Sequence, residues 1–76
     1  MLNRRSISVA FQDASLQIAT VTDRSWWRRA RVYTVALYGD CLWVRDDGNR
    51  PVTDSEVIEV LDAGRATAME IQRRRL

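Results

Sequence analysis

The sequence contains no histidine and no lysine, and it has one cysteine, one proline and three glycines in 76 residues. The single cysteine, Cys41, cannot form a disulfide within the chain. Without histidine, the common zinc ligand sets cannot be assembled, and without lysine, Schiff-base chemistry is excluded. The sequence therefore predicts a protein with no metal site, no cofactor and no disulfide framework.

Long hydrophobic runs are also missing. No apolar stretch approaches the roughly 18 residues of a membrane-spanning helix, and the N-terminus lacks the apolar segment of a secretory signal. We therefore expect a cytoplasmic protein with no membrane partner. The composition, 46% hydrophobic and 29% charged, is typical of a folded globular protein. The length predicts one domain over residues 1–76, with frayed basic ends at about 1–5 and 73–76.

All twelve basic residues are arginine, and the formal net charge is +2. Guanidinium groups suit bidentate contacts with carboxylate or phosphate. A codon bias in a GC-rich genome explains the same arginine usage without any functional pressure. The stretch 40–62 holds seven acids against two arginines, so the predicted surface is bipolar rather than uniformly basic.

Two β-hairpins are predicted in the first 45 residues. Segments 6–11 and 16–21 alternate apolar and polar residues around a polar tetrad, and pairing Phe11 with Leu16 gives them one continuous apolar face. Segments 31–38 and 41–45 flank a two-residue loop whose glycine supplies the positive φ of a tight turn. The nine residues 22–30 between the hairpins fit a loop, a helical turn or an extension of the strands.

The second hairpin has two apolar faces in its predicted register. A two-residue loop pairs Leu37 with Leu42 and places Tyr38 and Trp43 together on the opposite face. A sheet covered by a single helix should show polar residues on its open side. The face with Tyr38 and Trp43 therefore indicates a second covering layer or an interface.

A C-terminal helix is predicted from Thr53 to about residue 72, because Thr53 and Glu56 form a capping box ahead of an amphipathic pattern. The apolar stripe consists of Val57, Val60, Leu61, Gly64, Ala68 and Ile71. We expect Gly64 and Ala68 to permit close packing on the sheet, with a helix–helix dimer contact as the alternative. Two hairpins and this helix predict an α+β fold of order ββββα, a small antiparallel sheet packed against one amphipathic helix.

Residues that could carry catalysis do not converge on a recognisable motif. The carboxylates lie in a turn or on the polar sides of the predicted helix, where solvated surface charge explains them. Cys41, beside a hairpin turn, is expected to be a small packed residue rather than a reactive thiol. We therefore predict no catalytic residues and no enzyme activity.

A basic and aromatic cluster is the most unusual feature of the sequence, and it comprises Arg24, Trp26, Trp27, Arg28, Arg29 and Arg31. Three interpretations remain open: a tryptophan that plugs the core beside solvated arginines, a protein interface, and a surface for single-stranded nucleic acid. The termini add Arg4, Arg5 and the run 73–75, which form either solvated ends or part of a basic patch.

The leading hypothesis is a non-enzymatic interaction module, homodimeric, that docks on a larger host protein or complex. The cluster, together with Tyr38 and Trp43, forms the predicted partner-binding set. The size and composition of the chain suit a phage or mobile-element inhibitor of the anti-CRISPR kind, which acts by occupying a surface of its target. The alternative is a small nucleic-acid-binding regulator that uses the arginines and tryptophans.

Overall fold

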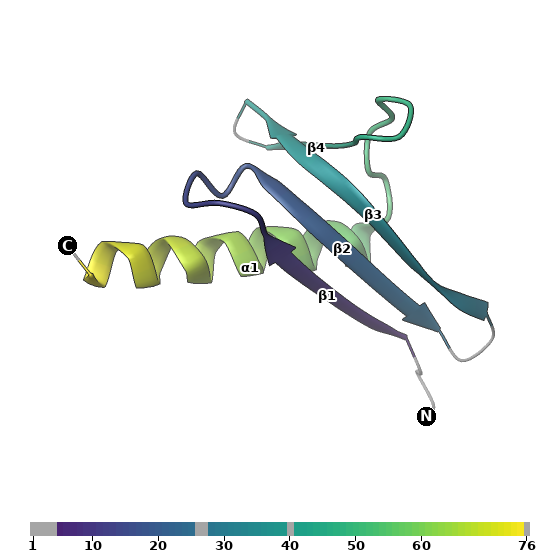
Figure 1. Cartoon of the computed structure of the whole chain (residues 1–76), viewed down its shortest axis with the longest axis horizontal. Coiled ribbons are helices and arrows are strands. Elements are labelled where there is room, and N and C mark those ends of the chain that lie inside the picture. Colours follow the sequence, from purple (N-terminus) through teal and green to yellow (C-terminus); the bar gives the residue numbers. More distant parts are fainter. Residues whose placement is uncertain (1–4, 26–27, 40, 76) are drawn as a thin grey trace.

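The computed structural model describes residues 5–25, 28–39 and 41–75. One four-stranded antiparallel sheet has the order β1-β2-β3-β4, and a single helix, α1, crosses one of its faces (Figure 1). The elements are β1 (Ser6–Phe11), β2 (Ile18–Ser25), β3 (Arg28–Tyr38), β4 (Leu42–Arg45) and α1 (Ser55–Arg74). The predicted ββββα fold is confirmed. In the described ranges no helix is both long and apolar enough to cross a membrane.

The core lies between the sheet and α1. Alternate residues of each strand point toward the helix, as the period of two in a strand requires. The buried cluster consists of Ala19, Val21, Val35, Leu37, Trp43, Val52, Val57 and Leu61. Side chains of β1 are only partly buried against it.

The predicted register of the first hairpin is wrong. Phe11 lies opposite Ala19, not Leu16, so the second strand is shifted by three residues and its two faces are exchanged. Ala19 and Val21, both fully buried, face the helix, and Ile18 faces the open side. With this register, Ala19 and Val21 contribute two buried side chains of β2 to the core.

The loop between β1 and β2 explains this shift. Asp13 accepts hydrogen bonds from the backbone N–H and the hydroxyl of Ser15 at 3.0 and 2.5 Å. Leu16 then adopts a positive φ of 57° and packs into the core at 5% exposure. Leu16 is therefore a loop residue, and the connection is two residues longer than the predicted tetrad.

The predicted register of the second hairpin is also wrong, by one residue. Leu37 pairs with Trp43 and Tyr38 pairs with Leu42, because three residues, not two, connect the strands. Gly39 has the expected positive φ of 64°. A shift of one residue exchanges the faces of β4, so Trp43 turns from the open side into the core.

Residues 22–30 extend the strands wherever the structure describes them. β2 continues to Ser25 and β3 begins at Arg28, with an irregularity in the ladder between Asp23 and Ser25. Of the three conformations that the sequence left open, the strand extension is therefore correct for residues 22–25 and 28–30. Residues 26 and 27 lie outside the described ranges.

Helix α1 begins at Ser55, two residues after the predicted start. Its N-cap is Asp54, whose carboxylate accepts the Glu56 N–H at 3.0 Å, so the predicted Thr53 capping box is wrong. The helix ends at Arg74, which is exposed and pairs with Glu70. The last arginines are therefore helical as far as residue 74, where their charge favours the negative end of the helix dipole.

Gly64 packs against the sheet, as expected. A Cβ at this position would lie 3.1 Å from Val9 Cγ2 and 3.6 Å from Phe11 Cε2. We expect Gly64→Leu to lower the free energy of unfolding by about 1 to 3 kcal/mol, because it overfills this contact. Urea denaturation measures the change, with Ala66→Leu on the exposed side of α1 as the control. Equal stability of the two variants would contradict this packing.

Candidate functional site

None of the strand residues on the open face of the sheet has a carboxylate side chain. Asp23 is the one acidic residue within the four strands, and it is buried on the helix side. A solvated sheet face usually alternates charged residues with apolar ones. Here threonine, serine, alanine and larger apolar residues take those positions, with the exposed Arg24 toward the end of β2.

One end of this face is apolar across three strands. In the ladder, Ile18 lies opposite Ala36, which lies opposite Val44, and Tyr38 lies opposite Leu42. Exposure is 36% for Ile18, 58% for Tyr38 and 46% for Leu42. We call these five residues the apolar patch. Because α1 covers the other face of the sheet, no described element covers the patch (Figure 1).

The described members of the predicted arginine and tryptophan cluster lie toward the opposite end of β3 from the apolar patch. Arg24, Arg29 and Arg31 are exposed, and none forms an ion pair within the described residues. Trp26 and Trp27 lie outside the described ranges, and for Arg28 the structure describes the backbone alone, in β3.

The predicted partner-binding set is therefore divided. Tyr38 stands at the far end of an eleven-residue strand from Arg28, a separation of roughly 33 Å at the rise of a β-strand. The prediction that Trp43 shares the open face with Tyr38 is wrong, because Trp43 is in the core and only 2% exposed. The structure brings Tyr38 together with Leu42 and Ile18, which were not in the predicted partner-binding set.

Two specific contacts hold the Trp43 side chain in the core. Its indole Nε1 donates a hydrogen bond to Asp62 Oδ1 at 2.9 Å, from β4 to α1. Its ring lies 6.3 Å from the Phe11 ring, at an interplanar angle of 50°. The carboxylate of Asp62, which the sequence placed among solvated charges, thus fixes a core side chain.

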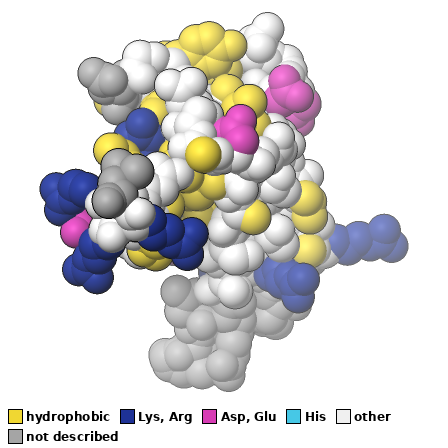
Figure 2. All heavy atoms as spheres, turned by 60° about the vertical axis from the view of Figure 1, so that its left-hand side comes forward, with side chains coloured by type: hydrophobic (Ala, Val, Ile, Leu, Met, Phe, Trp, Pro, Cys, Tyr) yellow, Lys and Arg dark blue, Asp and Glu magenta, His cyan; other side chains and the backbone are white. Residues whose placement is uncertain are grey.

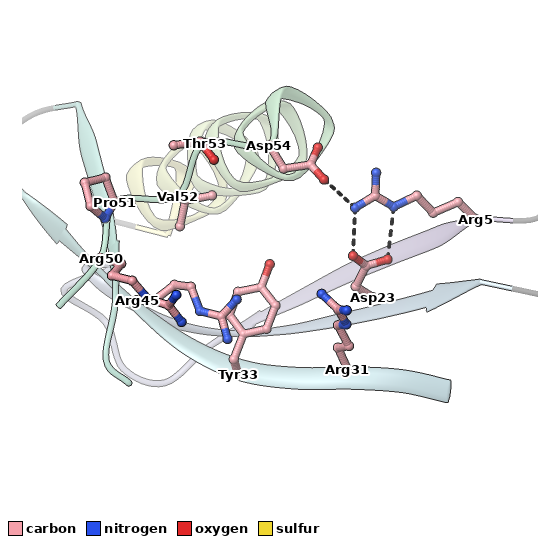
Figure 3. A pocket seen from close by; sticks show the side chains of 10 residues that line it. All are labelled: Arg5, Asp23, Arg31, Tyr33, Arg45, Arg50, Pro51, Val52, Thr53 and Asp54. Carbon is pink, nitrogen blue, oxygen red and sulfur yellow. Dashed lines mark hydrogen bonds and ion pairs between the residues drawn. The ribbon is translucent and has the colours of Figure 1, made fainter. Parts of the chain in front are cut away.

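A cavity of about 510 Å³ opens between the N-terminus of α1 and the helix side of the sheet (Figure 3). Arg5 projects into it and holds Asp23 with two hydrogen bonds, from Nε to Oδ1 at 3.0 Å and from Nη2 to Oδ2 at 2.7 Å. The same guanidinium pairs with Asp54 at 2.6 Å and Glu56 at 3.0 Å. This ion network links the residue before β1, the inner strand β2 near its end, and the helix cap.

Arg5 is therefore largely buried, and the prediction of a solvated end is wrong at this residue. Its side chain is 13% exposed and that of Asp23 is 5% exposed. A signal was present in the sequence, because Asp23 follows Ala19 and Val21 at the same strand period and an inward aspartate requires a cationic partner. The predicted register of the first hairpin ended the second strand at residue 21, so Asp23 was not assigned to either face of the sheet.

The network shifts the ionisation of its members. The hydrogen bond from Arg5 lowers the pKa of Asp54 below its ordinary value. The same contacts with Asp23 and Asp54 raise the pKa of Arg5, so it remains charged throughout the accessible pH range. The site is thus a fixed ion network rather than a pair of groups that exchange protons near neutral pH.

The rest of the cavity wall is aromatic and basic. The Arg45 guanidinium carbon lies 4.1 Å from the centroid of the Tyr33 ring, a cation–π contact, and Arg45 also pairs with Asp47 at 2.8 Å. Burial raises the pKa of the Tyr33 hydroxyl. Arg31 and Arg50 complete the wall and form no ion pair in the described part of the chain, so they are the groups that an anion would contact.

Chemistry-bearing residues do not gather elsewhere in the described ranges. In those ranges no group of three histidine, cysteine, aspartate or glutamate residues is placed to hold a metal ion. Cys41 is exposed, contrary to the expected packing. The chain matches no protein-family model, no curated protein and no solved structure.

Proposed function

We propose that this chain is a protein-binding module that docks on a larger protein through the apolar patch of its open sheet face. The observation that carries the proposal is the juxtaposition of Ile18, Tyr38 and Leu42 on a face whose strand residues include no carboxylate. Large apolar and tyrosine side chains supply most of the energy of protein interfaces when water is excluded around them.

The charges around the patch define the chemistry of the partner. None of the strand residues on this face is acidic, and the exposed Arg24 lies on it near the end of β2, whereas Arg31, opposite the inward Asp23, lies on the helix side. The complementary surface is therefore apolar at one end and acidic toward the other. A chain of this size acts on such a partner by covering a surface that the partner uses, which is the mode of a phage or mobile-element inhibitor.

The patch is tested by capture from a bacterial lysate treated with nuclease. We expect Leu42→Arg to reduce recovery of a specific bound protein by roughly tenfold or more, because a charge replaces one of the large apolar contacts of the patch. Met69→Arg is the matched control, since Met69 is exposed to 47% on α1 and Leu42 to 46% on β4. Mass spectrometry with isotope labels quantifies the bound protein for the wild type and both variants.

Three results would contradict this function. The first is a bound protein that Leu42→Arg recovers as well as the wild type does. The second is a bound protein that Met69→Arg loses as strongly as Leu42→Arg does. The third is that the wild type captures no specific protein. Circular dichroism of each variant is the control that tests whether the fold is retained.

A second candidate is nucleic-acid binding, favoured by the exposed Arg24, Arg29 and Arg31 near one end of the sheet. This function predicts bound material that disappears on nuclease treatment and an affinity that falls steeply with added salt. It also predicts that Leu42→Arg retains binding, because Leu42 lies at the other end of the face. The same capture experiment without nuclease therefore separates the two candidates.

A further inference from the structure

The two edges of the sheet are not equivalent. The edge at β4 is covered by residues 50–52, where the Arg45 N–H donates to Arg50 O at 2.7 Å and the Val52 N–H donates to Trp43 O at 2.8 Å. At β1, which forms the opposite edge, no described segment pairs with the outer side of the strand.

Strand β1 lacks the features that normally protect such an edge. Natural edge strands are blocked by charged side chains, proline or a β-bulge. The β1 sequence SISVAF contains none of these residues, and its pairing with β2 is regular over all six positions. The strand therefore presents an uninterrupted template for a further strand.

The outward backbone groups of β1 belong to the residues whose side chains face the helix. The Gln12 N–H donates to Ile18 O at 2.9 Å, in continuation of the β1–β2 register. In an antiparallel ladder every second residue exchanges these bonds, so the even-numbered residues bond to β2. The N–H and C=O groups of Ile7, Val9 and Phe11 therefore point away from the sheet.

This pattern is self-complementary. If two copies of β1 run antiparallel with Val9 opposite Val9, Ile7 lies opposite Phe11 and each outward N–H meets an outward C=O. Opposed side chains then lie on the same face of the sheet, toward the helices. The register that pairs the outward backbone groups therefore also places apolar side chains opposite apolar side chains. A partner strand of arbitrary sequence could form the same backbone hydrogen bonds without this apolar match.

Helix α1 supplies an apolar surface next to the same edge. Its C-terminal half extends past β1 (Figure 1), and a shallow groove of about 450 Å³ lies between them. The groove is lined by Val9 and by small or apolar residues of α1, including Val60, Gly64, Ala68 and Ile71. On this side of the molecule, hydrophobic side chains lie between separate groups of arginines (Figure 2).

We infer that the occupant of this edge and groove is a second copy of the chain. The two copies pair through β1 with Val9 at the two-fold axis, form one eight-stranded sheet and place both helices on the same face. Partly buried Ile7, Val9 and Phe11 become core residues of the dimer. The inference is independent of the proposed docking function, because the apolar patch lies on the open face toward the β4 end.

The register is tested with charges at Ser8 and Ala10, both exposed on the open face. In the inferred dimer Ser8 of each copy lies opposite Ala10 of the other. Ser8→Lys with Ala10→Lys places like charges across the axis and should weaken self-association by roughly tenfold or more. Ser8→Glu with Ala10→Glu should do the same, and an equimolar mixture of the two variants should associate as a heterodimer.

A matched control uses the same positions. Ser8→Lys with Ala10→Glu places opposite charges across the axis and should remain a dimer. Sedimentation equilibrium over a concentration series gives the masses, and wild type should have twice the 8.8 kDa of the chain. Three results each overturn the inference: a monomeric wild type at about 200 µM, dimeric variants with like charges, or a mixture that stays monomeric.

Discussion

Replacing Trp43 with alanine is expected to lower the free energy of unfolding by about 3 to 5 kcal/mol, the usual cost of truncating a buried tryptophan. The indole is 2% exposed, contacts Phe11 and donates to Asp62. A domain of this length has a total stability of roughly 4 to 11 kcal/mol, so the loss is a large part of the total and the melting temperature should fall steeply. Thermal denaturation followed by far-ultraviolet circular dichroism measures the loss.

Tyr38→Ala is the control for this prediction. Tyr38 is 58% exposed on the open face, and its removal should change stability by less than about 1 kcal/mol. Trp43→Phe should fall between the two, because it keeps most of the apolar contact and leaves Asp62 without the indole donor. If Trp43→Ala were as mild as Tyr38→Ala, the indole would belong on the open face and the register of β4 would have to move by one residue.

Replacing Arg5 with methionine is expected to lower the free energy of unfolding by about 3 kcal/mol. The change removes the guanidinium from both oxygens of Asp23, which is 3% exposed, and breaking one side of a buried ion pair costs more than the pair contributes. It also removes the contacts that join β1 to Asp54 and Glu56 at the helix cap. Urea denaturation near pH 7 measures the change.

A double variant distinguishes the buried charge from lost packing. Arg5→Met combined with Asp23→Leu removes both charges, so it should recover at least half of the stability that Arg5→Met alone loses. A double variant less stable than Arg5→Met would show that Asp23 is stabilised without Arg5. Arg29→Met, which removes an exposed arginine, should have little effect.

Acid should weaken the wild type through the same network. The contact with Arg5 lowers the pKa of Asp54 below its ordinary 3.8, so its contribution is complete above that value. This contribution is lost as the pH falls through the lower pKa of the folded state, where Asp54 takes up a proton. The stability difference between wild type and Arg5→Met should therefore shrink as the pH falls below about 4. A difference that stays constant over this window would contradict the ion network.

Local sequence patterns predicted the elements better than their registers. The alternation in residues 6–11, the glycine turn at Gly39 and the amphipathic stripe of α1 each reflect local periodicity, and each is present. Register depends on loop geometry that the pattern does not encode. Leu16 in a positive φ conformation and a third residue in the β3–β4 connection moved one strand of each hairpin by an odd number of residues.

These register shifts also explain which site residues were missed. Exchange of faces on β4 took Trp43 out of the predicted binding set and put Leu42 on the open face. Exchange on β2 turned Asp23 inward and made Arg5 its partner. The lack of charge and proline in β1 can be read from its sequence. Its place at the edge of the sheet, and the covering of the β4 edge by residues 50–52, depend on the tertiary structure and cannot be read from local sequence.

Photo-crosslinking from Cys41 tests the docking function most directly. Cys41 is exposed and directly precedes Leu42, so a benzophenone attached to its thiol reaches any protein seated on the apolar patch. The reference is Cys41→Ser with Ala66→Cys, which carries the same group on the exposed side of α1. We predict a discrete, nuclease-resistant crosslinked protein from position 41 that is lost with Leu42→Arg and absent from position 66. Equal crosslinking from both positions, or none from position 41, would contradict the assignment of the open sheet face as the docking surface.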